Sequence, residues 1–93
     1  MPTEEEVKDY LGIDFEEEVS NRNIKRYINV AKSYLEGSIS KLPENDERVK
    51  QLALFIIEDL YDRGSYSVKE NNTLEKMKND FIMQLQCEGR ENG

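Results

Sequence analysis

The longest apolar run of the chain decides the fold: Leu52-Ala53-Leu54-Phe55-Ile56-Ile57. Six apolar residues in a row fit either a buried strand or part of a buried helix. Polar residues at helical spacing on both sides favour a helix from about Asp46 to Arg63. Asn45 or Asp46 is the expected N-cap, and Gly64 the expected end. A helix that is apolar around most of its circumference is predicted to lie at the centre of the domain.

A second helix is predicted upstream, from about Ser20 as N-cap to Glu36, with Gly37 ending it. Its apolar residues recur at three- and four-residue spacing, as an amphipathic helix requires. They are Ile24, Tyr27, Ile28, Ala31, Tyr34 and Leu35. The acidic residues 16–18 offer an earlier start for the same helix, and residues 38–43 form a linker to the central helix.

A short first helix is expected at residues 4–11. Thr3 followed by Glu6 has the spacing of a capping box, and Gly12 is a natural C-terminal stop. Val7, Tyr10 and Leu11 share one face of this helix. An isolated helix of this length is not stable in water, so it must dock on the rest of the domain.

A fourth helix is expected at residues 73–86, with Asn72 and Glu75 as a cap-like pair. Its apolar stripe consists of Leu74, Met77, Phe81 and Leu85. Residues 65–72 are expected to be irregular, and residues 88–93 to form a disordered tail. The predicted fold class is therefore all-α: a small four-helix domain spanning 1–87, with a long central third helix, a short N-terminal helix and a C-terminal helix.

The charge of the chain limits its partners. Twenty acidic and thirteen basic residues give a net charge of −7. Repulsion from phosphate argues against a dedicated DNA-binding protein. No apolar run approaches the roughly 20 residues of a membrane span, and the acidic N-terminus lacks a hydrophobic signal region. We expect a soluble intracellular protein that makes no membrane contact.

The residue types argue against catalysis. The chain has no histidine and one cysteine, Cys87, so neither a zinc or copper site nor a cofactor is expected. Cys87 has no neighbouring base in the sequence that would make it a nucleophile. The carboxylate clusters at 4–6, 16–18 and 58–62 fit solvated helix faces. The sequence predicts that the protein is not an enzyme.

A basic cluster on the second predicted helix contains Arg22, Lys25, Arg26 and Lys32. With Tyr27 close by, it suits nucleic acid or a protein partner with an acidic surface. Tyr27 itself falls on the apolar stripe of that helix, which favours a place in the core.

The five tyrosines are numerous for a chain of this length. Tyr10, Tyr27 and Tyr34 are predicted to face the core. Tyr61 and Tyr66 flank the Gly64 loop, where core and interface positions are equally compatible with the sequence. Phe55 widens the apolar surface of the central helix, and contact with another subunit is left open for it.

Four segments, in fixed order, carry a resemblance to a known family. They are residues 5–14 (EEVKDYLGID), 28–37 (INVAKSYLEG), 42–51 (LPENDERVKQ) and 84–86 (QLQ). The chain resembles the small helical, portal-binding head–tail connector (adaptor) proteins of long-tailed phages. The family often ends in Gln-Leu-Arg-Gly, whereas this chain has Gln86 and Cys87 at the last two positions.

The resemblance implies a structural virion protein, made in the host cytoplasm and located at the head–tail junction. Such proteins form a ring, commonly a dodecamer, below the portal protein. The ring extends the DNA channel, through which DNA passes without specific binding, and docks a head-completion (stopper) or tail protein. Candidate interface residues are Phe55, Tyr61, Tyr66, Val68, Gln84, Leu85 and Gln86. The alternative is a small helical adaptor or a DNA-binding regulatory protein that acts as a monomer or dimer.

Overall fold

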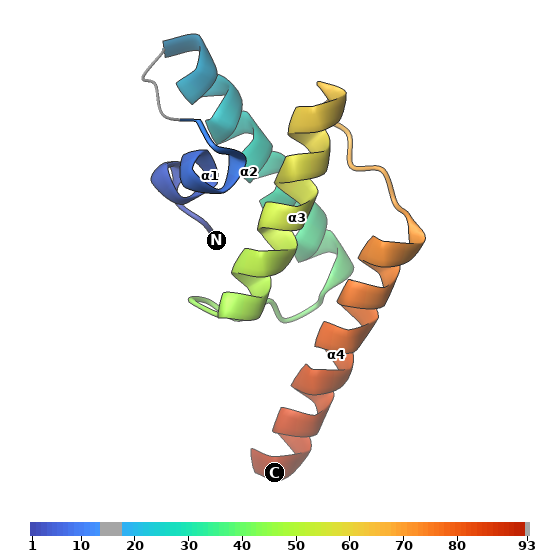
Figure 1. The fold of residues 1–93 in the computed structure, drawn as a ribbon. Helices are drawn as coiled ribbons and strands as arrows, with labels where there is room; N and C mark the ends of the chain where they lie inside the picture. Colours follow the sequence, from blue (N-terminus) through green and yellow to red (C-terminus); the bar gives the residue numbers. More distant parts are fainter. Residues whose placement is uncertain (14–17, 93) are drawn as a thin grey trace.

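Four helices make up the computed structural model, which describes residues 1–13 and 18–92. They are α1 (Glu4–Leu11), α2 (Glu18–Ser38), α3 (Glu47–Arg63) and α4 (Asn72–Asn92). No strand occurs in these residues, so the predicted all-α class is confirmed. Helices α1, α2 and α3 pack on one another, whereas α4 lies along α3 (Figure 1).

Helix α3 is the centre of the core, as the apolar run predicts. Its buried side chains are Val49, Leu52, Ala53, Leu54, Ile56, Ile57 and Leu60. Burial of an aliphatic side chain of this size contributes roughly 1.5–3 kcal/mol. The central position of α3 does not make it the longest helix, because α2 and α4 have 21 residues each and α3 has 17.

Local capping signals fix both ends of α1. The Thr3 hydroxyl accepts a hydrogen bond from the Glu6 amide at 3.2 Å, and the Glu6 carboxylate accepts one from the Thr3 amide at 3.0 Å. Gly12 ends the helix in the left-handed conformation, with φ of 76°. The capping box and the glycine stop predicted from the sequence are therefore confirmed.

The ends of α3 also match the prediction. Asp46 is the N-cap, and its Oδ1 accepts from the Arg48 amide at 2.8 Å. Gly64 closes the helix with φ of 62°, a conformation that costs a residue with a side chain about 1 kcal/mol or more.

Helix α2 extends past both predicted ends. It begins at Glu18, so Ser20 lies inside the helix and is not its N-cap. The early start suggested by the acidic residues is correct for Glu18, while residues 16 and 17 lie outside the described part of the chain. Gly37 does not end the helix, because Ile39 is buried and its amide donates to the Leu35 carbonyl at 2.9 Å.

Both ends of helix α4 also differ from the predicted ends. Asn71, rather than Asn72, is the capping side chain, and its Oδ1 accepts from the Leu74 amide at 2.9 Å. The helix continues to Asn92, past its predicted end at residue 86, while the disordered tail expected at residues 88–93 stays a prediction. Two physical reasons are visible: no proline interrupts 88–92, and Arg48 of α3 holds the Glu88 carboxylate at 2.7 Å.

The three tyrosines predicted to face the core differ in their burial. Tyr27 is 7% exposed and belongs to the core, as expected. Tyr34 is half-buried. Tyr10 is 45% exposed, so its predicted core position is wrong. The reason is that α1 buries only a narrow face: Val7 is its one buried residue, and Leu11 is half-buried.

The molecule is elongated, with extents of 48 × 24 × 19 Å. The C-terminal part of α4 runs past the first turn of α3 and projects from the body formed by α1, α2 and α3 (Figure 1). None of the helices, as far as the structure describes them, has the length and apolar character that a membrane crossing needs.

Candidate functional site

The predicted interface residues fall into separate groups along α3. Tyr61 and Tyr66 lie at its C-terminal end, whereas Gln84 lies beside its first turn, where it meets Arg48. Tyr61 lies thirteen helical positions after Arg48, which places these groups about 20 Å apart. The seven candidates therefore do not form one continuous site.

Three tyrosines gather where α2 meets the end of α3. The Tyr66 ring stacks on Tyr27 with 5.2 Å between centroids and 27° between planes. The Tyr61 ring meets Tyr27 edge-on, at 6.4 Å and 83°. Burial, together with the two neighbouring tyrosines, raises the pKa of Tyr27 above its ordinary value. The buried Tyr27 ring is thus the common packing partner of the two exposed rings.

The loop between α3 and α4 is held in place by polar contacts. The Tyr66 hydroxyl donates to Asn23 Oδ1 at 3.0 Å, which ties the loop to α2. Arg63 donates to the Ser67 carbonyl at 2.9 Å, and Asp59 holds the same guanidinium at 2.7 Å. Tyr66 is therefore presented to solvent in a defined orientation, 39% exposed.

Arg26 belongs to the same surface. Its guanidinium lies over the Tyr66 ring, 4.8 Å from the centroid. Neither Arg26 nor Arg22, one turn earlier, pairs with a carboxylate among the residues that the structure describes. A guanidinium resting on an aromatic ring keeps its N–H groups available for a carboxylate or phosphate.

The predicted basic cluster is divided by the fold. Lys25 lies 3.9 Å from Glu4 of α1. Lys32 lies further along α2 and lines a hollow near the other end of that helix. Of this cluster, Arg22 and Arg26 remain together as two cations with no ion pair in the described part of the chain, and two cations are too small a patch to follow a nucleic-acid backbone.

At the other end of α3, in its first turn, Arg48 binds the candidate residue Gln84. Its guanidinium donates to Gln84 Oε1 at 3.1 Å, to Glu88 Oε1 at 2.7 Å and to Asp46 Oδ2 at 2.7 Å. It also lies 5.1 Å from the centre of the Phe81 ring. Hydrogen bonds to Asp46 and Glu88 raise the pKa of Arg48, and the bond from Arg48 lowers the pKa of Asp46. This network fixes the last turns of α4 against the start of α3.

The remaining candidates differ in exposure. Phe55, Val68 and Leu85 are half-buried and pack against the core. Gln86 is exposed on the projecting part of α4. Met83, which was not among the candidates, is 63% exposed on the same segment.

Lys78 is a further contact residue that sequence reasoning missed. Its side chain is 10% exposed, and its ammonium donates to Tyr34 at 2.5 Å and approaches Glu75 at 3.0 Å. Burial works to lower the pKa of Lys78, but the bonds to Tyr34 and Glu75 outweigh it and raise the pKa. Its position between Leu74 and Phe81 on the apolar stripe of α4 is the sequence feature that indicates a buried lysine.

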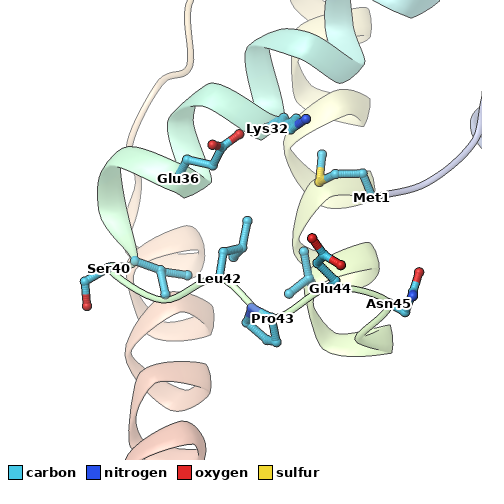
Figure 2. A pocket seen from close by; sticks show the side chains of 10 residues that line it. Met1, Lys32, Glu36, Ser40, Leu42, Pro43, Glu44 and Asn45 are labelled. Atoms are coloured by element: carbon cyan, nitrogen blue, oxygen red, sulfur yellow. The ribbon is translucent and has the colours of Figure 1, made fainter.

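An open hollow lies at the α2–α3 linker (Figure 2). Its volume is about 570 Å³, and Lys32, Glu36 and Glu44 meet apolar side chains of Met1 and Leu42 there. Charged, polar and apolar side chains therefore share its lining.

The described residues contain no group of three His, Cys, Asp or Glu side chains placed to hold a metal ion. Cys87 is exposed on α4. Comparison of the chain with protein-family models, with curated proteins and with solved structures finds no match. The surfaces described above are therefore the basis for a functional proposal.

Proposed function

We propose that the chain is a structural head–tail connector that forms a ring below a phage portal and docks the next head-completion or tail protein. The observation that carries the proposal is the projecting end of α4. It leaves the helical body beside Arg48 and exposes Met83 and Gln86. A helix that reaches beyond its own domain suits insertion between neighbouring proteins of an assembly.

The order of the four segments that resemble the connector family supports the same function. So does the small size of the domain, because a chain of 93 residues buries a limited core and often gains stability from neighbours. The candidate residues at both ends of α3 suit a ring subunit, which must contact its neighbours and also the proteins above and below it.

The net charge of −7 is consistent with a channel component. DNA that passes through a ring must not adhere to its wall, and an acidic wall repels phosphate. Specific contacts to DNA are not part of the proposal.

Native mass spectrometry over a concentration series, with and without the cognate portal protein, tests the function. The proposal expects a closed ring of about a dozen copies, either alone or on the portal. A monomer or dimer that ignores the portal under all conditions would refute it and would favour a small helical adaptor.

A further inference from the structure

Three exposed tyrosines lie beside the C-terminal half of α3, where Tyr61 and Tyr66 contact Tyr27 and Tyr10 contacts Glu58. Four large hydrophobic side chains are exposed in the described part of the chain, and Tyr10, Tyr61 and Tyr66 are three of them. Tyr61 and Tyr66 share contacts with Tyr27. Tyrosine combines large contact area with a polar tip and is enriched at protein interfaces. We call the surface formed by Tyr10, Tyr61 and Tyr66 the tyrosine surface.

Two pairs of like charges border the tyrosine surface. Arg22 and Arg26 lie on α2, where Arg26 contacts Tyr66. Glu58 and Asp62 lie on the exposed side of α3. Tyr10 approaches Glu58, and burial followed by the hydrogen bond to that carboxylate raises the pKa of Tyr10.

Neither pair is neutralised by the side chains that the structure describes. Among the ion pairs of the described residues, none contains Arg22, Arg26, Glu58 or Asp62. Arg48 and Arg63, in contrast, each have a carboxylate within 2.7 Å. Two like charges four residues apart on a helix repel each other mildly, so each pair gains from an opposite pair brought in by a partner.

The two pairs have the same spacing. Both join residues four positions apart, which places their side chains roughly 5–6 Å from each other at Cβ. A helix that carries two arginines at this spacing matches a helix that carries two carboxylates at the same spacing. Since the chain contains both, the partner that fits its tyrosine surface is a second copy of itself.

We propose that neighbouring copies associate through the tyrosine surface, with Arg22 and Arg26 of one copy facing Glu58 and Asp62 of the next. The proposal deepens the connector function and rests on it, because an arginine pair on one copy that faces the carboxylate pair of the next is a head-to-tail contact, and such contacts can close into a ring. The tyrosines supply the apolar contact area, and the charge pairs set partner choice and register.

Charge reversal provides the test. Native mass spectrometry and analytical ultracentrifugation would compare the wild-type chain with R22E/R26E and with E58R/D62R. Each variant places like charges across the interface, and association is expected to weaken at least about tenfold. In an equimolar mixture of the two variants, every contact between unlike copies joins opposite charges, and mixed complexes are expected to form.

A matched control for R22E/R26E is K41E/K76E, which makes the same change of net charge at two exposed lysines away from the tyrosine surface. It is expected to assemble as the wild type does. Circular dichroism checks that every variant keeps its helices, and the mixture distinguishes a lost contact from a folding defect.

The outcomes separate this inference from the connector function. Rings that form equally well with R22E/R26E would overturn the inference and leave the connector function in place. Mixed dimers without any ring would support the tyrosine surface and count against the connector. Binding of duplex DNA by the wild type, abolished in R22E/R26E, would overturn the inference by showing that phosphate is the partner of the arginine pair.

Discussion

The ammonium group of Lys78 donates a hydrogen bond to the Tyr34 hydroxyl at 2.5 Å, and the same hydroxyl donates to Glu70 at 2.7 Å. The chain of bonds links α4, α2 and the loop before α4. Lys78 also lies 4.8 Å from the centre of the Tyr34 ring. Because α4 otherwise packs along α3, this contact joins α4 to α2.

Lys78→Ala is expected to lower the free energy of unfolding by about 1–3 kcal/mol, because it removes charge-assisted hydrogen bonds and the packing of the aliphatic stem. Lys76→Ala is the matched control, since Lys76 is an exposed lysine on the same helix. Its effect should stay within about 0.5 kcal/mol. Urea denaturation followed by circular dichroism measures both, and equal effects would contradict the role of Lys78.

Arg48→Ala should loosen the end of α4 without unfolding the domain. The substitution removes the donors that hold Gln84 and Glu88. Hydrogen exchange measured by mass spectrometry should show roughly two- to fivefold faster exchange in residues 84–92, as expected for a network screened by solvent. Exchange in the core of α3 should stay unchanged. If residues 84–92 exchange at the wild-type rate, Arg48 does not fix this segment.

Helix positions were predictable where the signal is local. The capping box of Thr3 and Glu6, the Asp46 cap and the Gly64 stop act through neighbours in sequence, and the structure has all three. The far ends of α2 and α4 depend on partners distant in sequence. Burial of Ile39 extends α2, and contact with Arg48 supports α4 up to Glu88.

The candidate site was harder to predict than the helices. The position of Tyr61 and Tyr66 beside the Gly64 loop indicates an interface role, but their common contact with Tyr27 depends on how the loop folds back. The bond from Tyr66 to Asn23 spans 43 residues, which no local pattern indicates. Tyr10 was misplaced because its helix periodicity does not reveal how narrow a face α1 buries.

The pH dependence of stability should contain a contribution from Glu6. The Lys50 ammonium lies 2.7 Å from Glu6 Oε2 and joins α3 to α1. The bond from Lys50, followed by that from the Thr3 amide, lowers the pKa of Glu6 from 4.5 to about 2. As the pH falls, Glu6 is therefore protonated in the unfolded chain before it is protonated in the folded chain. The contribution of Glu6 to stability is complete above pH 4.5 and is lost as the pH falls towards 2.

Glu6→Gln should accordingly be less stable than the wild type at pH 6, and the difference should shrink between pH 4.5 and pH 2. Glu5→Gln is the control, because Glu5 is an exposed neighbour without a bond to Lys50. Thermal unfolding at a series of pH values measures both variants. A Glu6→Gln difference that stays constant over this range would rule out the contribution.

Gly64→Ala tests the conformation of the turn on which the tyrosine surface depends. Gly64 has φ of 62°, and no atom lies within 4 Å of an added Cβ, so the cost is one of backbone strain alone. Alanine there should lower the free energy of unfolding by about 1 kcal/mol. Gly37→Ala is the matched comparison, because Gly37 lies inside α2 with equally open surroundings. It should stabilise the domain by about 0.5 kcal/mol. Opposite signs in chemical denaturation would support the left-handed turn, whereas a neutral or stabilising Gly64→Ala would show that the loop after α3 does not need it.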